Sequence, residues 1–270
     1  MNNLNTTGAE GEARFSRRRM LGYMLAEGVV LGMPELCLAL VRNDGALHTN
    51  SLGMEFILCP AGTFMMGGNR DGPVHQVTLT RPFYLGRFPV TQAQWEAVMG
   101  NNPSCFTGAE HPVERVSWHD AQAFITTLNR QEGTNSYRLP TEAEWEYGAS
   151  AGTTEAWFWD EDEDEEELGE YAWFRGNSDD STHPVGLKKA NPWGLHDMCG
   201  NVWEWVEDRY KRYTAASSVD PRGPASGDYR VLRGGSWLNY AEYCRSASRN
   251  NRTPDNRNCH VGFRLALSPG

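Results

Sequence analysis

The stretch Tyr229-Arg-Val-Leu-Arg-Gly-Gly-Ser-Trp237 lies near the carboxyl end of the chain, and the run Val261-Gly-Phe-Arg-Leu-Ala266 follows it. Each contains a short apolar run that is typical of a β-strand. Gly234 and Gly235 permit a backbone conformation closed to other residues, so a tight turn is expected after the first strand. The two stretches therefore predict framework strands on either side of the segment between them.

The intervening segment, Leu238 to His260, is rich in asparagine and arginine, with five of the first and four of the second. Its residues follow neither the helix period nor the strand period for long, which predicts a surface with little regular structure. Loops favour Asn in general, so an ordinary solvated loop is one interpretation of this composition. The sequences on either side of the segment favour a different interpretation.

In these flanks, Arg-Val-Leu-Arg-Gly-Gly-Ser-Trp is followed by Cys-Arg-Ser-Ala and by a closing Gly-Phe-Arg. This order resembles the end of the formylglycine-generating-enzyme (sulfatase-modifying factor) family. Upstream runs at 60–68, 137–147 and 191–205 also look like this family, and the resemblance covers roughly residues 53–266. Members have a C-type-lectin-like fold, so the resemblance implies an α+β fold of that type with much irregular structure.

The Asn-rich interior resembles one branch of the family, the variable proteins of diversity-generating retroelements. There, Asn codons are mutated at their adenines, and the products display different residues on a fixed scaffold. An Asn codon ending in C cannot become Lys, Glu, Gln, Met, Trp or a stop in this way, so Glu242 is taken as fixed. Within a variable region of about 230–264, the candidate ligand-binding positions are Leu238, Asn239, Tyr240, Tyr243, Ser248, Asn250, Asn251, Arg252, Asn256, Asn258, Cys259 and His260.

Catalysis by this chain is not expected. The oxidases of the family hold copper with two cysteines near this segment, and aligning their motif retains Cys244 but places Asn239 where the first cysteine stands. An amide cannot replace a thiolate on Cu(I). The resemblance then implies a non-catalytic protein that binds a ligand, most simply another protein, because Tyr and Arg concentrate binding energy. The alternative is a copper-dependent formylglycine-generating oxidase that acts on a substrate cysteine.

No cofactor is required by this interpretation, although the resemblance implies a calcium site. In relatives the Gly-Asn-x-Trp-Glu-Trp segment can hold calcium, which here points to Asn201 and Glu204. Hard oxygen ligands suit calcium, but two side chains are far from a full shell. Hydrogen bonds from these side chains to backbone in a tight turn are the other interpretation. His183 and His196 are expected to be structural, because neither has a His or Cys at metal-ligand spacing.

Composition limits the classes of partner and the cellular compartment that we expect for this protein. The 270 residues include ten each of Trp, Tyr and Phe, enough for a core, and the net charge of -10 argues against nucleic acid. The run 20–41 is too interrupted to span a membrane, although Arg17–Arg19 faintly resembles a twin-arginine signal. Six scattered cysteines favour reduced, buried thiols and a cytoplasmic location over an exported one. Their even number leaves disulfides open.

The chain divides into a tail with a helical extension, 1–52, and one domain, 53–270. In the domain, strands are expected at 54–58, 74–80 and 83–88. Helices are expected after three hydroxyl N-caps, each followed three residues later by an amide or acid. The unbroken acidic run at 160–167 is expected to be an exposed, mobile loop, because like charges repel. The three caps are Thr91, Ser117 and Thr141.

Overall fold

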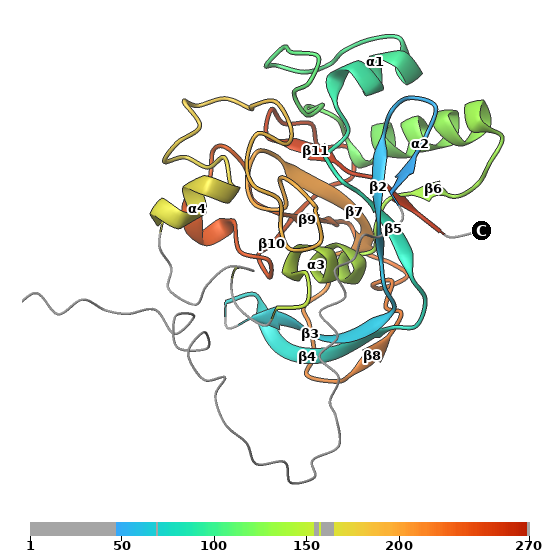
Figure 1. Ribbon diagram of the computed structural model, residues 1–270. Helices are drawn as coiled ribbons and strands as arrows, with labels where there is room; N and C mark the ends of the chain where they lie inside the picture. Colours follow the sequence, from blue (N-terminus) through green and yellow to red (C-terminus); the bar gives the residue numbers. More distant parts are fainter. Residues whose placement is uncertain (1–46, 69, 154–156, 158–164, 269–270) are drawn as a thin grey trace, which may run out of the picture. The chain divides into compact units, whose positions relative to one another are not determined.

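The computed structural model describes residues 47–68, 70–153, 157 and 165–268 (Figure 1). Most of the predicted tail and extension, and the acidic run up to residue 164, lie outside the described residues. Within the described part, no helix is long and apolar enough to cross a membrane.

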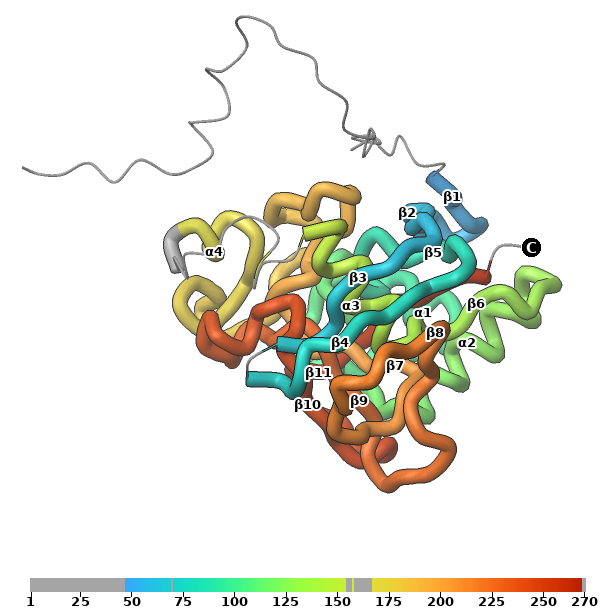
Figure 2. Tube along the Cα trace, turned by 90° about the horizontal axis from the view of Figure 1, so that it is seen from below, coloured from blue at the N-terminus to red at the C-terminus, as the bar shows by residue number. Residues whose placement is uncertain are grey.

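Three sheets organise the domain, and the carboxyl-terminal strands enter two of them (Figures 1 and 2). In the five-stranded sheet, β12 lies between β5 and β6 and is antiparallel to both. In the four-stranded sheet, β11 runs parallel to β7 at one edge, while β10 forms the other edge. The five-stranded sheet contains β1 (His48–Thr49), β2 (Glu55–Cys59), β5 (Phe83–Gly86), β12 (Ala266–Leu267) and β6 (Tyr137–Arg138). The four-stranded sheet contains β10 (Arg249–Arg252), β9 (Arg230–Arg233), β7 (Trp203–Arg209) and β11 (Val261–Phe263), and the three-stranded sheet contains β3 (Gly62–Gly68), β4 (Gly72–Leu79) and β8 (Ser218–Val219).

The three helices predicted from their caps are present. They are α1 (Gln92–Met99), α2 (Trp118–Glu132) and α3 (Glu142–Ser150). In each, the N-cap hydroxyl accepts a hydrogen bond from the backbone N–H three residues on, and that residue's side chain accepts one from the N-cap backbone N–H. These reciprocal bonds satisfy N–H groups that the first turn of a helix leaves unpaired.

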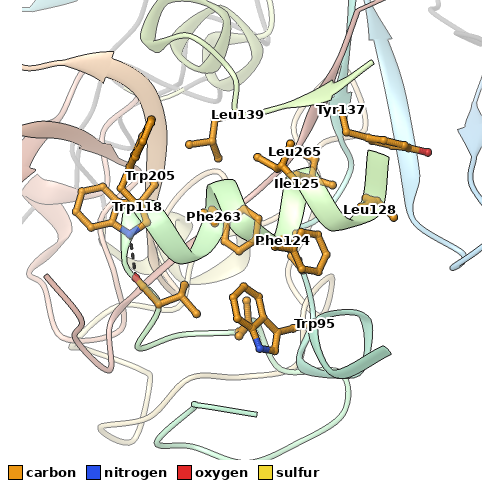
Figure 3. Packing of buried hydrophobic residues seen from close by; sticks show 14 of the residues in the cluster. Trp95, Trp118, Phe124, Ile125, Leu128, Tyr137, Leu139, Trp205, Phe263 and Leu265 are labelled. Atoms are coloured by element: carbon orange, nitrogen blue, oxygen red, sulfur yellow. Dashed lines mark hydrogen bonds between the residues drawn. The ribbon is translucent and has the colours of Figure 1, made fainter. Parts of the chain in front are cut away.

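Aromatic side chains from distant parts of the chain fill the core between α1, α2 and the sheets (Figure 3). Trp95 of α1 stacks on Phe124 of α2 with ring centroids 5.4 Å apart, and Phe263 of β11 packs edge-on against Phe124 at 5.5 Å. The indole of Trp205 donates to the carbonyl oxygen of Val116 at 3.0 Å. These large rings supply the apolar area that was expected from the ten Trp, ten Tyr and ten Phe residues of the sequence.

Several local predictions need correction. Strand β1 joins the sheet ahead of Gly53, so the domain begins earlier than predicted. Residues 165–167, placed in the acidic loop, begin helix α4 (Glu165–Tyr171). The middle of the Asn-rich segment, expected to be irregular, contains a short 3-10 helix, η2 (Ala241–Tyr243), and strand β10.

Candidate functional site

The Asn-rich segment leaves the four-stranded sheet through a turn that only glycine can form. Gly234 and Gly235 have φ of 98° and 76°, in the left-handed region. A Cβ on Gly235 would lie 2.8 Å from the carbonyl oxygen of Tyr243 and 2.9 Å from Sγ of Cys244. The close approach folds the beginning of the segment back onto η2.

Trp237 holds the segment after this turn. It is nearly buried, and its backbone N–H donates to the carbonyl oxygen of Asn201 at 2.9 Å. Its indole N–H donates to the carbonyl oxygen of Cys259 at 3.0 Å, and its ring meets Phe106 edge-on at 5.3 Å. One side chain thus joins the beginning and the end of the Asn-rich segment.

The three exposed apolar and aromatic side chains of the segment come directly after this tryptophan. Leu238, Tyr240 and Tyr243 have exposed fractions of 41%, 58% and 44%. The guanidinium of Arg175 lies 4.9 Å from the ring centre of Tyr240, and the backbone N–H of Arg175 donates to the carbonyl oxygen of Asn239. Large side chains with open faces next to a cation form a surface suited to contact with another molecule.

Further contacts bring Asn239, Arg252 and His260 to the same region. The indole of Trp203 donates to Oδ1 of Asn239 at 2.8 Å, and its backbone N–H donates to the carbonyl oxygen of His260 at 2.9 Å. Burial, and then the positive charge of Arg252, lower the pKa of His260, which favours the neutral imidazole. Arg252 in turn donates to Oδ1 of Asn250 at 3.0 Å.

The remaining predicted positions lie at the edge strand and in the loop that follows it. Asn250 and Asn251 belong to β10, and Asn256 and Asn258 are joined by a side-chain hydrogen bond. These four side chains and Cys259 are all half-buried. Ser248 differs, because only 2% of it is exposed and its hydroxyl donates to the backbone carbonyl of Glu242. We call the eleven partly or fully exposed positions the display set: Leu238, Asn239, Tyr240, Tyr243, Asn250, Asn251, Arg252, Asn256, Asn258, Cys259 and His260.

Between the display positions, buried arginines fasten the segment to the core. Arg249 of β10 forms a bidentate ion pair with Glu142 of α3, with N–O distances of 2.6 and 2.8 Å. Glu142 also pairs with the fully buried Arg233, which contacts Glu146 as well. Arg245 pairs with Asp71 at 2.9 Å. Losing one partner of such a buried pair would leave an uncompensated charge in the core. The pairs therefore hold the Asn-rich segment in one position against the core.

Asn239 and Cys244, the residues that the resemblance aligns with the copper cysteines, do not form a pair of sulfur ligands. Oδ1 of Asn239 accepts hydrogen bonds from Trp203 and from the hydroxyl of Ser236, so the amide is a structural group here. Cys244 is completely buried, and burial raises the pKa of its thiol to about 12. Cu(I) needs soft sulfur ligands, and Asn239 supplies none, because its amide oxygen is an oxygen donor already bonded to protein groups.

The predicted calcium ligands are also occupied by protein groups. Both carboxylate oxygens of Glu204 accept from the guanidinium of Arg264 at 2.7 Å, and Oε2 also accepts from the indole of Trp145. Asn201 bonds the backbone N–H and carbonyl of His183. As placed, the two side chains do not fit a calcium shell, and the alternative interpretation, backbone bonding by Asn201 in a turn, describes one of them.

The prediction of reduced cysteines was wrong for two of them. Cys105 and Cys259, 154 residues apart in sequence, form a disulfide. Cys59, Cys199 and Cys244 are free and buried, as predicted. Cys37 lies outside the described residues.

With the fold and the segment described, comparison with known proteins identifies the scaffold. The model of the sulfatase-modifying factor enzyme 1-like domain matches residues 45–269. The chain belongs to this sulfatase-modifying factor family. A formylglycine-generating enzyme of Thermomonospora curvata is 35% identical over 296 aligned residues, covering 79% of this chain and 93% of the enzyme. The chaperone protein LppX of Paenibacillus barcinonensis is 34% identical over 253 residues, covering 75% of this chain and 86% of LppX.

A solved structure adds a third kind of relative. Treponema denticola variable protein 1 has a TM-score of 0.79 and 35% sequence identity, covering 83% of this chain and 99% of that protein. The C-type-lectin-like α+β fold of the sulfatase-modifying factor family is therefore confirmed. Since similar proteins in this family are named as an enzyme, a chaperone and a variable protein, the fold alone does not give this chain its function.

Sequence reasoning missed the residues that support the display set from elsewhere in the chain. Arg175 and Cys105 contact the set itself, and Phe106 packs against Trp237, which supports it; all three lie 60 or more residues before Leu238. Each is an ordinary residue in its local sequence, so no motif could have pointed to it. Trp237 belongs to a framework flank in the sequence, and its two hydrogen bonds show that it supports the site.

Proposed function

We propose that this protein is a non-catalytic ligand-binding member of the sulfatase-modifying factor family, and that its display set varies between copies through a diversity-generating retroelement. The proposed partner is a protein. The likeness to a variable protein at 35% identity supports the proposal. So does the occupied amide of Asn239, which stands where the oxidases of the family place a copper cysteine.

The observation that carries the proposal is the separation of exposed from buried positions within one segment. Eleven of the twelve predicted variable side chains are at least partly exposed, whereas Trp237 before them and Cys244 and Arg245 between them are buried. Four residues outside the predicted set are exposed as well: Glu242, Thr253, Asp255 and Arg257. Surface substitutions usually change stability by less than about 0.5 kcal/mol. A segment built in this way tolerates many sequences at Leu238, Tyr240 and Tyr243, its most exposed display positions, without losing its shape.

A stability comparison tests this separation. We expect Leu238→Ser together with Tyr243→Ser to lower the free energy of unfolding by no more than about 1 kcal/mol, because both side chains are exposed. Trp237→Ala should lower it by about 3 kcal/mol or more, because it removes a buried ring and leaves the carbonyl of Cys259 without its indole donor. Urea unfolding measures both, and equal losses would contradict the proposal.

The retroelement has a test of its own. Sequencing the DNA beside the gene should show a near-identical repeat of the segment that differs mainly at adenines, with a reverse transcriptase gene nearby. A neighbourhood without such a repeat would contradict a retroelement origin. In that case the stability comparison would still test whether the exposed surface tolerates substitutions.

The second candidate is the copper-dependent oxidase, which the 35% identity to a formylglycine-generating enzyme favours. We expect the protein neither to take up Cu(I) one-to-one nor to convert the cysteine of a sulfatase-type peptide to formylglycine. Uptake of Cu(I) that Cys244→Ser abolishes would favour the oxidase instead.

A further inference from the structure

The disulfide lies at a cluster of potential metal ligands that the proposed function does not use. One ligand atom each from Cys105, Glu114 and Cys259 lies within 4.8 Å of the other two. Cys105 is exposed, Cys259 is half-buried and Glu114 is fully buried. Two sulfurs and a carboxylate gathered this closely form a donor set that suits zinc when the sulfurs are reduced.

Glu114 supplies the second, independent observation. Its Oε1 accepts from the backbone N–H groups of Cys105 and Phe106, at 2.5 and 2.9 Å. Its Oε2 has no hydrogen-bond partner among the described residues, although the side chain is completely buried. An unsatisfied buried carboxylate oxygen is unfavourable, and it calls for a partner at this place.

The backbone holds the three groups together without the disulfide. The two backbone bonds to Glu114 fix the loop that carries Cys105. Cys259 is held by the indole of Trp237 through its carbonyl oxygen, and the next residue, His260, is held by the backbone N–H of Trp203. The donor atoms therefore stay close when the sulfur–sulfur bond is broken.

We propose that the reduced protein binds one zinc ion through Cys105, Glu114 and Cys259, and that disulfide formation, by exchange with a small-molecule disulfide that is reduced to two thiols, closes this site. Two molecules of a thiol reductant convert the disulfide to two thiols and leave as their own disulfide. Binding of Zn²⁺ then releases two thiol protons and forms two zinc–sulfur bonds and one zinc–oxygen bond. Three protein ligands leave the fourth tetrahedral position to water or to a donor atom of a bound molecule.

Zinc binding by the reduced protein does not depend on the proposed display function. If both hold, the display function limits zinc binding to copies that have cysteine at position 259. Cys259 belongs to the display set, and the remaining ligands, Cys105 and Glu114, lie outside it. If the display function holds, the metal site is a property of this particular copy. A copy with another residue at 259 keeps only two of the three donors.

The experiment uses the whole protein, reduced with a phosphine and desalted under argon, with Zn²⁺ as the probe and a chromophoric chelator as competitor. We expect one zinc per chain in the reduced protein and none at this site in the oxidised protein. Cys105→Ser, Cys259→Ser and Glu114→Gln should each weaken binding by about tenfold or more, since even residues behind metal ligands contribute that much. Co²⁺ in place of Zn²⁺ should give a thiolate-to-metal absorption that either cysteine substitution reduces.

Cys59→Ala is the matched control, because it removes a buried thiol outside the cluster and should leave zinc binding unchanged. Circular dichroism checks that each variant folds, and Glu114→Asp, which keeps a carboxylate, replaces Glu114→Gln if that variant does not. Zinc uptake by the reduced protein that survives the double substitution Cys105→Ser, Cys259→Ser would overturn the proposal. So would an absence of uptake, or wild-type affinity in both Glu114 variants.

Discussion

Glu142 shows at the scale of one residue how the display set is kept in place. It is the common partner of Arg233 and Arg249, and all three side chains are almost inaccessible to solvent. A carboxylate in this position compensates two buried guanidinium groups, one in β9 and one in β10. The edge strand that carries Asn250 and Asn251 is thereby joined to helix α3.

Replacing this carboxylate should be far more harmful than replacing an exposed one. We expect Glu142→Gln to lower the free energy of unfolding by about 3 kcal/mol or more, because it leaves buried positive charge uncompensated. Glu242→Gln is the control, since Glu242 pairs with Arg70 at the exposed surface and such pairs contribute less than about 1 kcal/mol. Urea denaturation compares the two, and similar losses would show that the buried pairs are not what holds β10.

Asp208 makes a second prediction at this scale, on pH. Burial, and then the negative charge of Glu142, raise the pKa of Asp208 to about 8 from an ordinary value of 3.8. Between these two values the folded protein keeps a proton that the unfolded chain has lost. Stability from this group is therefore full at low pH and is lost as the pH rises toward 8.

We expect Asp208→Asn to flatten this dependence, so that the variant loses at least about 1 kcal/mol less than the wild type between pH 5 and pH 8. Thermal unfolding across that range measures the difference. Asp228→Asn, at an exposed position, should leave the dependence of the wild type unchanged. A wild type whose stability rises over this range, with Asp208→Asn following it, would contradict the assignment.

At the scale of the element, the turn after β9 decides where the display set begins. Gly235 needs both a left-handed backbone and an empty position where a Cβ would stand. The turn brings η2 and Cys244 against the strand end. Without it, Leu238 and Tyr240 would leave the sheet in another direction.

Gly235→Ala separates these two requirements when it is compared with Gly100→Ala. Both glycines have nearly the same φ, 76° and 77°, but a Cβ on Gly100 would meet nothing within 4 Å. Gly100→Ala should lower stability by about 1–2 kcal/mol, from the backbone conformation alone. Gly235→Ala should lower it clearly further, because its Cβ would contact backbone. Calorimetric unfolding checks this, and equal losses would mean that the close approach is relieved at no cost.

At the scale of the whole molecule, Arg264 joins the carboxyl-terminal strands to the rest of the domain. Its guanidinium binds both oxygens of Glu204 and donates to the backbone carbonyls of Gly86, His196 and Asp197. One side chain thus connects the segment between β11 and β12 to β7, to β5 and to the loop before β7. We therefore expect the buried contacts of Arg264 to contribute more to the free energy of unfolding than an ion pair on the surface.

Arg264→Lys tests this connection against a matched surface pair. Arg257 binds both oxygens of Asp120 in the same bidentate geometry, but it is half exposed. Lysine cannot reproduce a bidentate contact. We expect Arg264→Lys to lower the free energy of unfolding by about 3 kcal/mol or more, and Arg257→Lys by less than about 1 kcal/mol. If the two losses measured by urea denaturation were alike, burial would not be the deciding factor.

The parts of the fold that local sequence controls could be predicted, and those that depend on distant residues could not. The caps at Thr91, Ser117 and Thr141 are complete within four residues, so their helices were found. Strand β10 has no alternating pattern and forms because its backbone pairs with β9, which no local signal reveals. Similarly, Glu204 was predicted as a candidate calcium ligand, whereas its carboxylate pairs with Arg264, 60 residues further along the chain.

The candidate site also has features that could be predicted from local sequence and features that depend on distant residues. The exposure of Tyr240 and Tyr243 could be predicted, because the Asn-rich segment that contains them was expected to lie at the surface. The burial of Ser248 did not, because its hydroxyl is satisfied by a backbone carbonyl that only the folded turn presents. The pairing of Cys105 with Cys259 joins two loops 154 residues apart, and neither cysteine has a neighbour that would announce it.

The position of β11 and β12 has a consequence for synthesis on the ribosome. Both strands come after the Asn-rich segment, and β12 lies inside a sheet whose other strands are made much earlier. A polypeptide that terminates within the segment lacks both strands and cannot complete either sheet. We therefore expect a chain truncated within the segment to be degraded rather than to accumulate in a folded form.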